Sequence, residues 1–188
     1  MAEAEEYCRQ ALALNPQDSI GHSISGAIMA LSGDALRGHE AGKRAIELNP
    51  SSSIAHFCAA FPLVYIGRGE KTLTGVDQAI RLSPRDPMMP IYYGLQALAY
   101  LVLRKYDGSI AYARRALQEQ PDNVRVLLRL AAAEAHKGDL DAARTTYAKA
   151  EQIMPSPTRK FFAASHRFAN SEDFDFRLEG LRLAGWEG

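Results

Sequence analysis

A short motif returns along this chain at a nearly constant interval. Five helix-like segments rich in alanine end in proline: ALALNP, AIELNP, AIRLSP, ALQEQP and AEQIMP, ending at Pro16, Pro50, Pro84, Pro121 and Pro155. The intervals between these prolines are 34, 34, 37 and 34 residues. Internal periods of about 20 to 50 residues are typical of repeat arrays, in which each repeat packs mainly against its neighbours. The chain is therefore expected to be an array of small repeats.

Positions that were not used to find the repeat keep its phase. An alanine stands five residues before every proline: Ala11, Ala45, Ala79, Ala116 and Ala150. Small residues also stand twelve residues before each proline (Ala4, Gly38, Thr72, Ser109 and Ala143) and twenty-four before four of them (Gly26, Ala60, Ala97 and Ala131). Small side chains at fixed positions let two helices approach closely. Gly33, Gly67 and Gly138 share a phase that suits the turn between paired helices.

A 34-residue period with these small positions, and with Tyr100 and Tyr147 at aromatic positions, resembles the tetratricopeptide repeat. The resemblance implies an all-α fold, a right-handed superhelical solenoid of antiparallel helix pairs. The expected array covers residues 1–155, as a half repeat at 1–16 and full repeats at 17–50, 51–84, 85–121 and 122–155. Residues 156–188 are expected to form C-terminal capping helices, at about 157–169 and 173–184.

Two places interrupt the regular pattern. Pro62 lies inside a helical segment and lacks a backbone N–H group, so a kink is expected near Phe61. The stretch SPRDPMMP, residues 83–90, carries the three-residue insertion, and its prolines make it a stiff, irregular linker.

The array begins in the middle of a repeat. A half repeat leaves Tyr7 and Ala11 facing a partner helix that is absent, whereas the end of a natural solenoid usually carries a polar cap. We expect the chain to be the C-terminal fragment of a longer protein, with self-association through the open N-terminal end as a possibility. The alternative is a native start with a fraying or dimerising first helix.

Composition narrows the function classes. The 22 basic and 22 acidic residues give no net charge, which argues against an electrostatically driven nucleic-acid binder. No apolar run approaches the ~20 residues needed to cross a bilayer, and the acidic start lacks the pattern of a signal peptide. The two cysteines, Cys8 and Cys58, are too few for a disulfide framework and are expected to pack as small apolar residues. A cytoplasmic protein is expected.

Motifs that carry chemistry are missing from the sequence. The segment GRGEKT, residues 67–72, has Glu70 where a phosphate-binding loop needs glycine and follows a helix instead of a strand. His22 and His56 are equivalent in successive repeats but have no third ligand at that phase, so helix-interface histidines are expected instead of a metal site; His39, His136 and His166 are expected at the surface. Asp18, Asp34, Asp107, Asp122 and Asp139 fall at turns and helix starts, where they act as caps. We therefore expect no enzyme activity, no cofactor and no metal.

The densest charged feature is a set of basic residues in the third and fourth repeats: Arg104, Lys105, Arg114, Arg115, Arg125 and Arg129. A solvated outer face is expected for them, with an acidic partner or nucleic-acid phosphate as the alternative.

In tetratricopeptide arrays the first helix of each repeat lines the inner groove. The resemblance places twelve residues there: Ile20, Ser23, Ala27, Ile54, Phe57, Phe61, Ile91, Gly94, Leu98, Arg125, Leu128 and Ala132. All but Arg125 are apolar or small, which disfavours the clamp for acidic chaperone tails found in this family. An apolar groove favours a helix or hydrophobic segment, and residues 174–186 of this chain are one candidate occupant. The alternative is that several of the twelve are core residues between repeats.

The last third of the chain carries a narrower resemblance. The segments ARRALQEQPDN, LRLAAAEAHKGDLDAARTTYAKAEQIMP and FRLEGLRLAGW, with SPRDP at 83–87, resemble the C-terminal tetratricopeptide region of bacterial class III adenylate/guanylate cyclase-like regulators. Family members close with L-x-G-L-R-x-A-G, present here as Leu178 to Gly185, and then usually with Leu-Pro-Glu, where this chain has Trp186, Glu187 and Gly188. In those proteins a nucleotide cyclase or DNA-binding domain precedes the repeats.

The resemblance implies a non-catalytic interaction or regulatory module at the C-terminal end of such a cyclase, acting in signal transduction. Its partner would be a protein or peptide, or the upstream domain of the same polypeptide. The alternative is a freestanding scaffold that binds a hydrophobic peptide or helix of another protein.

Overall fold

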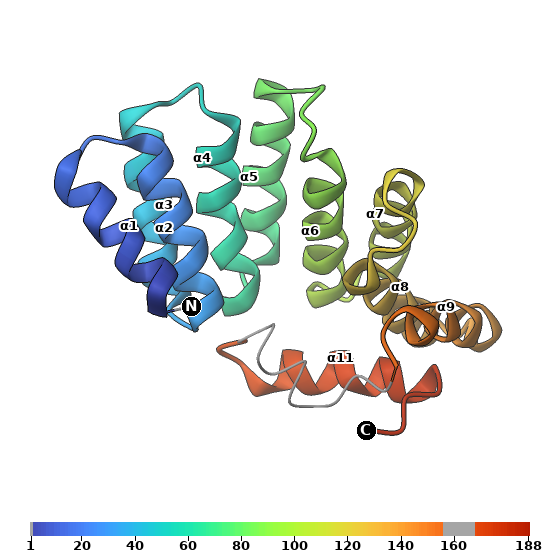
Figure 1. The fold of residues 1–188 in the computed structure, drawn as a ribbon. Helices are drawn as coiled ribbons and strands as arrows, with labels where there is room; N and C mark the ends of the chain where they lie inside the picture. Colours follow the sequence, from blue (N-terminus) through green and yellow to red (C-terminus); the bar gives the residue numbers. More distant parts are fainter. Residues whose placement is uncertain (1, 156–167) are drawn as a thin grey trace. The chain divides into compact units, whose positions relative to one another are not determined.

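The structure is a computed structural model that describes residues 2–155 and 168–188. These residues form ten α-helices and one 3-10 helix, and no strand occurs among them. In chain order the elements are α1 (Ala2–Leu14), α2 (Ser19–Ser32), α3 (Ala35–Leu48), α4 (Ser53–Ala60), η1 (Phe61–Ile66), α5 (Gly69–Leu82), α6 (Met89–Val102), α7 (Tyr106–Glu119), α8 (Val124–Lys137), α9 (Leu140–Ile153) and α11 (Ser171–Leu183) (Figure 1). The helix expected at about 157–169 lies almost entirely outside the described residues.

Each full repeat folds as one helix pair. The pairs are α2 with α3, α4–η1 with α5, α6 with α7, and α8 with α9, and within each pair the helices run alongside one another in contact. Asp18, Asp34 and Asp139 accept hydrogen bonds from backbone N–H groups at the starts of α2, α3 and α9, as expected for caps. At α8 the cap is Asn123 instead of Asp122.

The turn glycines behave as their phase predicts. Gly33, Gly67 and Gly138 have positive φ angles of 103°, 72° and 95°. At this left-handed backbone conformation a side chain would strain the turn, whereas glycine ends the helix at little cost. A shared sequence position therefore corresponds to a shared turn geometry in three of the repeats.

The small residues allow the close helix approach that was predicted from their spacing. A Cβ atom on Gly38 would lie 2.6 Å from the carbonyl oxygen of Gly26, so neither residue can be larger without moving a helix. At the equivalent position of α7, the Ser109 hydroxyl donates a 2.9 Å hydrogen bond to the carbonyl of Ala97 on α6. The two small positions of a repeat are thus direct neighbours across its helix pair.

The alanine five residues before each proline marks the interior of each pair. Ala45, Ala79, Ala116 and Ala150 are buried in the four full repeats. Ala11 of α1 is exposed, and Tyr7 on the same helix keeps 62% of its surface in solvent. The exposure expected for these two residues is observed, and the expected preceding segment stays a prediction.

Pro62 interrupts the second full repeat where a kink was expected. The α-helical pattern of α4 ends at Ala60, and residues 61–66 continue as the tighter 3-10 helix η1. Proline removes a backbone donor from the α-helical ladder, and a 3-10 turn is a common way of rejoining the chain. The stretch from α4 to η1 therefore has the length of one regular helix but not its regular geometry.

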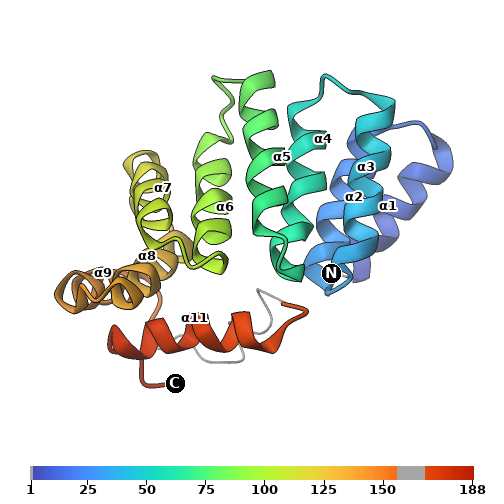
Figure 2. The ribbon, with the colours of Figure 1, turned by 180° about the vertical axis from the view of Figure 1, so that it is seen from behind.

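The chain divides into two compact units, and each is described by itself. The described residues of unit 1 are 2–86 together with 168–169, and those of unit 2 are 87–155 together with 170–188. The division falls inside the proline-rich insertion at 83–90. Helix α11 packs against α8 and belongs to the same unit (Figure 2). The expected array at 1–155 with a cap at 156–188 stays a prediction.

Candidate functional site

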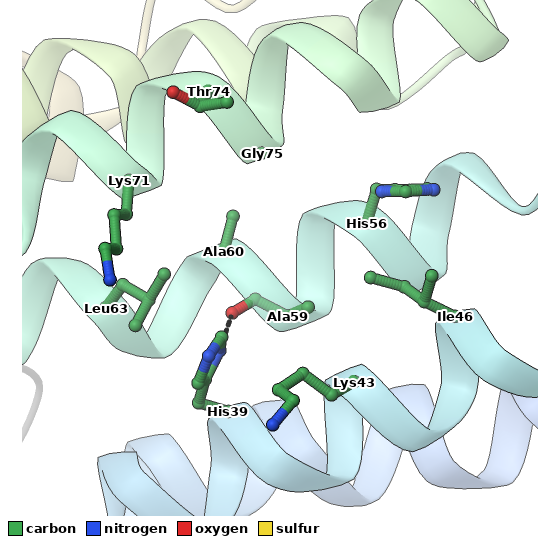
Figure 3. Close-up of a pocket in the computed structure, with 10 residues that line it drawn as sticks. All are labelled: His39, Lys43, Ile46, His56, Ala59, Ala60, Leu63, Lys71, Thr74 and Gly75. Carbon is green, nitrogen blue, oxygen red and sulfur yellow. Dashed lines mark hydrogen bonds between the residues drawn. The ribbon is translucent and has the colours of Figure 1, made fainter. Parts of the chain in front are cut away.

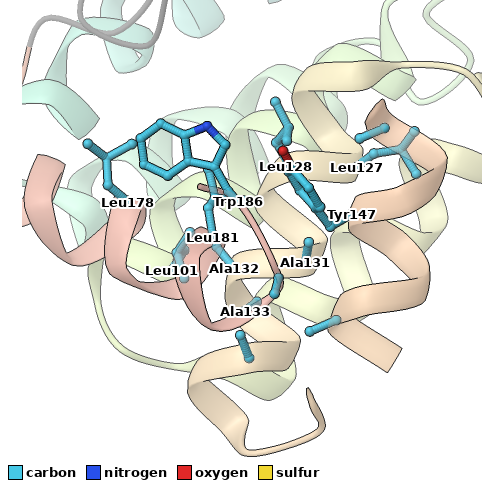
Figure 4. Packing of buried hydrophobic residues seen from close by; sticks show 14 residues of the cluster. Leu101, Leu127, Leu128, Ala131, Ala132, Ala133, Tyr147, Leu178, Leu181 and Trp186 are labelled. Carbon is cyan, nitrogen blue, oxygen red and sulfur yellow. The ribbon is translucent and has the colours of Figure 1, made fainter. Parts of the chain in front are cut away.

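Helix α11 covers the first helix of the last repeat. Leu178 and Leu181 of α11 are completely buried in one hydrophobic cluster with Leu128 and Ala132 of α8 (Figure 4). Leu128 and Ala132 are two of the residues expected to line a groove. The segment 174–186, considered above as a candidate occupant of that groove, therefore covers these two groove positions in unit 2.

The crossing of the two helices is close because of one glycine. A Cβ atom on Gly180 would lie 2.8 Å from the His136 ring and 2.9 Å from the carbonyl oxygen of Ala132. Such distances leave no room for a side chain, so glycine at this position lets α11 approach the α8 backbone. The neighbouring Leu178 and Leu181 then reach the alanine-rich face of α8.

Aromatic stacking holds the start of α11. The rings of His136 and Phe176 are parallel, with centroids 3.7 Å apart, and Tyr106 stacks on the other members of this group at 5.8 and 6.4 Å. The Nε2 atom of His136 lies 2.8 Å from the carbonyl oxygen of Phe176, to which its N–H donates. The expectation that His136 is a surface group is wrong: burial beneath α11 lowers its pKa below the usual 6.5.

The basic residues of the third and fourth repeats do not form one solvated face. The Arg104 guanidinium bonds Asp173 of α11 at 3.1 Å and lies 3.3 Å above the centre of the Phe176 ring. Arg129 is buried and donates to the carbonyl of Gly94 at 2.8 Å. These are structural contacts within unit 2, and they correct the expectation of an outer basic surface.

Two further residues of this basic set, Arg114 and Arg115, also contact residues of unit 2. Arg114 pairs with the buried carboxylate of Glu134 at 2.9 Å. The Arg115 guanidinium lies 4.1 Å above the Tyr93 ring. Arg125 is exposed. An extended phosphate-binding patch would need these side chains free to face one partner, and most of them are committed elsewhere.

Most of the small and apolar residues of the closing motif have a packing role, whereas Leu183 is exposed. Leu178, Leu181 and Ala184 are buried, and Gly180 makes the close crossing. Gly185 turns the chain with a φ of 106°. The backbone N–H of Trp186 then donates to the carbonyl of Leu181 at 2.9 Å. The indole of Trp186 is then buried against the hydrophobic cluster.

In unit 1 an aromatic cluster lies at the groove positions of the second full repeat. Phe57 and Phe61 stack at 6.0 Å, and Phe61 meets Tyr65 edge to face at 5.3 Å. Phe168 adds a fourth ring, 5.4 Å from Tyr65, and the Ala169 N–H donates to the Tyr65 carbonyl at 2.7 Å. Tyr65 and Phe168 were not predicted from the sequence, because neither occupies a groove phase of the repeat.

The twelve predicted groove residues thus divide by exposure. Ser23, Phe57, Gly94, Leu98, Leu128 and Ala132 are buried; Ala27, Ile54 and Phe61 are half-buried; Ile20, Ile91 and Arg125 are exposed. The six buried residues are packed by the protein itself, which corrects their assignment to an open groove and agrees with the alternative of core residues. The other six stay a prediction.

The histidines and cysteines show no catalytic arrangement in the part of the chain that the structure describes. The Nε2 atoms of His22 and His56 lie 2.9 and 3.0 Å from the carbonyl oxygens of Pro16 and Pro50, six residues earlier, so both rings brace the turn that precedes their helix. Burial raises the pKa of the Cys58 thiol to about 12. Residues 2–155 and 168–188 contain no group of three His, Cys, Asp or Glu side chains placed to hold a metal ion.

The longest α-helices among the described residues have 14 residues. None of those that the structure describes combines the length and apolar character needed to cross a bilayer.

Comparisons with known proteins agree with the repeat architecture. Residues 95–157 match the family model described as tetratricopeptide repeat. The chain is similar to the crystal structure of YrrB, a TPR protein with an unusual peptide-binding site (19% identity, 96% of this chain and 92% of that chain, TM-score 0.61). It is also similar to PilW, a widely conserved type IV pilus biogenesis factor (16% identity, 94% and 78%, TM-score 0.73).

A third similar structure is TTC0263, a thermophilic TPR protein of Thermus thermophilus (22% identity, 95% of this chain and 88% of that chain, TM-score 0.70). At these identities the likeness concerns the fold. The expected all-α tetratricopeptide-repeat solenoid is confirmed, and the repeats of residues 95–157 are confirmed by sequence as well.

Proposed function

We propose that this chain is a non-catalytic protein-interaction module that binds an apolar helix or peptide on the first helices of unit 1. One observation carries the proposal: in unit 2 the equivalent surface of α8 already holds an amphipathic helix, α11. The repeat places Ser23 and Ala27 of α2 at the phases of Leu128 and Ala132, and Ile20 at the phase of Arg125, one helical turn earlier. Ile20 keeps 57% of its surface exposed, so α2 presents apolar area that a similar helix would bury.

The contacts of α11 indicate the chemistry of the partner. Its apolar residues Leu178 and Leu181 lie three apart on a helix, and Gly180 provides the close approach. A helix with two such apolar positions and a small residue between them would place its side chains against Ile20 and the half-buried Ile54. Burial of a few large apolar side chains contributes about 1.5–3 kcal/mol each, enough for micromolar binding after the costs of association.

Fluorescence anisotropy on the full chain tests this proposal. The probe is a labelled peptide with the α11 sequence, residues 171–186, and the variant is Ile20→Asp with Ile54→Asp. We expect the double variant to lose binding, because both carboxylates would be desolvated beneath the peptide. Ile153→Asp, at an exposed position on α9, is the matched control and should bind as the parent does. Equal binding by both variants would refute the surface.

A finer proposal is that the module is the C-terminal part of a class III adenylate/guanylate cyclase-like regulator and that its partner is the upstream domain. The support is the resemblance of the closing motif and of SPRDP to that family. An immunoblot of the native gene product in its source cells tests it. A band well above the 20.7 kDa of this chain supports the upstream domain and calls for cyclase assays with and without the repeats. A band at that mass would contradict it.

The alternative is a freestanding cytoplasmic scaffold, and the surface of α1 suggests how it would assemble. Tyr7 and Leu14 are 62% and 90% exposed, so a second copy could cover them by self-association. Sedimentation of the full chain and of Leu14→Glu distinguishes the cases. Loss of a dimer in the variant supports self-association, and a monomeric parent at micromolar concentration excludes it.

A further inference from the structure

A pocket in unit 1 lies outside every surface considered so far. It has a volume of about 290 Å³ and is bounded by α3, α4 with η1, and α5. Its lining residues are His39, Lys43, Ile46, His56, Ala59, Ala60, Leu63, Lys71, Thr74 and Gly75 (Figure 3). None of these lining residues belongs to the predicted groove.

The pocket exists because small residues meet beneath it. A Cβ atom on Gly42 would lie 2.4 Å from the Cα of Ala59, and one on Gly75 would lie 2.6 Å from the Cβ of Ala60. Helices α3 and α5 therefore approach α4 closely on either side, while Ala59 and Ala60 provide little side-chain volume above the α4 backbone. The result is a hollow with an apolar floor, extended by Leu63 and Ile46.

Basic side chains surround this floor. Lys71 of α5 and His39 of α3 lie toward one end of the pocket, and Ile46 and His56 lie toward the other (Figure 3). Lys43 of α3 lies between them, across α4 from Lys71. No carboxylate is among the lining residues that the structure describes. Outside the lining, the carboxylate of Glu40 accepts from Lys43 at 2.9 Å at the exposed edge of α3.

The histidines are already oriented by the backbone. The Nδ1 atom of His39 lies 2.8 Å from the carbonyl oxygen of Ala59, to which its N–H donates (Figure 3). His56 donates from Nε2 to the carbonyl of Pro50. These hydrogen bonds hold both rings at the wall of the pocket, and Lys43 and Lys71 supply its ammonium groups.

We propose that this pocket binds a small organic monocarboxylate with a short apolar body. The apolar body would lie on Ala59, Ala60 and Leu63, where its burial is favourable, and the carboxylate would pair with the ammonium of Lys71 and share that of Lys43. The sites for small molecules are typically hollows of this kind, mostly apolar with a few placed polar groups. The proposal does not depend on the protein-interaction function, because the pocket is formed by other faces of the helices.

Titration of the full chain with hexanoate and with its uncharged isostere hexanamide tests the site. Chemical shifts of the Ala59 and Ala60 methyl groups report binding, and those of Ala132 in unit 2 report non-specific effects. We expect saturable shifts at Ala59 and Ala60 with hexanoate, and at least about fivefold weaker binding of hexanamide because the ion pair is missing.

Two further variants test the contribution of the ion pair and that of the cavity separately. Lys71→Met with Lys43→Met should weaken hexanoate binding by about five- to tenfold and leave hexanamide binding unchanged, whereas Lys149→Met on α9 should change neither. Thr74→Phe should fill the exposed mouth of the pocket and abolish both. All four substituted residues are at least partly exposed, so the fold is expected to tolerate them.

Three results would overturn the proposal. They are shifts of Ala132 as large as those of Ala60, equal affinity for hexanoate and hexanamide, and no saturable shift at millimolar hexanoate. A further arm uses the peptide acetyl-Ala-Leu with a free or an amidated carboxyl end. If this peptide binds only with its carboxylate free, and more tightly than hexanoate does, the natural carboxylate is a polypeptide terminus and the assignment to a small molecule is wrong.

Discussion

Helices α2 and α8 occupy the same position in two repeats, but they differ in how many of their residues are buried. Ten of the fourteen residues of α8 are buried, and they include valine and leucine side chains. Five residues of α2 are buried, and all five are glycine, serine or alanine. Ile24 in the middle of α2 is 45% exposed. Position within the repeat therefore decides which residues face the paired helix, but it does not decide what covers the other faces.

The cover in unit 2 is α11, which comes from the end of the chain. Its contacts with α8 add a third helix to the pair α8–α9, so residues that would line an open groove become core. Leu128 contacts this third helix, but Ser23 and Phe57, at the same phase in unit 1, are buried as well. Burial at this phase therefore follows from the repeat, and α11 adds apolar contacts from Leu178 and Leu181.

The ion pairs follow the same contrast. In the described part of unit 1 they join residues three apart on one helix, as in Arg9 with Glu6 and Lys43 with Glu40. In unit 2 several join different elements, including Arg104 with Asp173 and Arg114 with Glu134. Exposed pairs on one helix contribute little to stability, whereas a pair with a buried partner ties elements together at a high cost if it is broken.

The largest expected effect is the loss of the α11 anchor. Leu181→Ala removes a completely buried side chain, and we expect the free energy of unfolding of unit 2 to fall by about 3 kcal/mol. Ile24→Ala on α2 is the matched change in unit 1 and should cost about 0.5 kcal/mol or less. Urea denaturation followed by hydrogen exchange of α8 and α2 amides measures both. Similar costs at the two positions would show that the units do not differ as described.

The next effect concerns a buried carboxylate. Glu134 accepts from Arg114 at 2.9 Å and from the Thr146 hydroxyl at 2.7 Å, so Glu134→Ala leaves both donors without their acceptor and should cost about 2 kcal/mol. Glu40→Ala in unit 1 breaks only an exposed pair, and no measurable change is expected. Denaturant midpoints of the two variants give the comparison. If Glu40→Ala is the more harmful, the contrast between the ion pairs is wrong.

Helix caps should show no difference between the units. Asp18→Ala and Asp139→Ala each remove an acceptor for one backbone N–H group, at 3.0 and 3.2 Å, and each should cost about 1 kcal/mol. The costs should match because a cap acts within one turn, whatever covers the helix. Thermal unfolding of both variants tests this equality. Serine at either position should restore most of the loss.

The smallest effect is a dependence of α11 docking on pH. Burial lowers the pKa of His136 in the folded protein, so the unfolded state binds the proton more readily. The stability due to neutral His136 is complete above about pH 6.5, the usual pKa, and falls as the pH drops from there toward the lower folded pKa. The hydrogen bond to Phe176 and the charge of Glu179 oppose the shift, and the charge of Arg104 adds to it.

Hydrogen exchange of α11 amides at about pH 7.5 and about pH 5.5, corrected for the intrinsic exchange rates, measures this dependence. We expect the corrected protection of α11 to decrease at the lower pH. His136→Gln keeps a donor for the Phe176 carbonyl but does not titrate, so its protection should not change. A parent protein with the same protection at both pH values would contradict the role of His136.

Much of the fold was predictable because it depends on neighbours within one repeat. The helix pairs, the turns at Gly33 and Gly138, the cap at Asp18 and the interruption near Phe61 all follow from residues a few positions apart or from one repeat period. The candidate site was predictable only in part. The groove phase marked Ile20, which is exposed and stays a prediction, but it also marked Leu128, which is buried.

The remaining features depend on residues far apart in the chain. His136 meets Phe176 forty residues later, and Arg104 meets Asp173 across sixty-nine. No local pattern distinguishes such an arginine from one at a solvated surface. The pocket beside Lys71 likewise needs α3 and α5 to approach α4 from two sides, which the repeat allows but does not specify.

The amino-acid order therefore determines the repeats, their helix pairs and their turns, since each small or capping residue acts on partners within about one period. The packed structure determines which faces of those helices remain open. In unit 2 the covered face of α8 is the one against which α11 packs. This packing depends on the fit of Gly180, Leu178 and Leu181 to the alanine-rich face of α8. Such a fit depends on packing between distant segments, so periodicity alone cannot predict it.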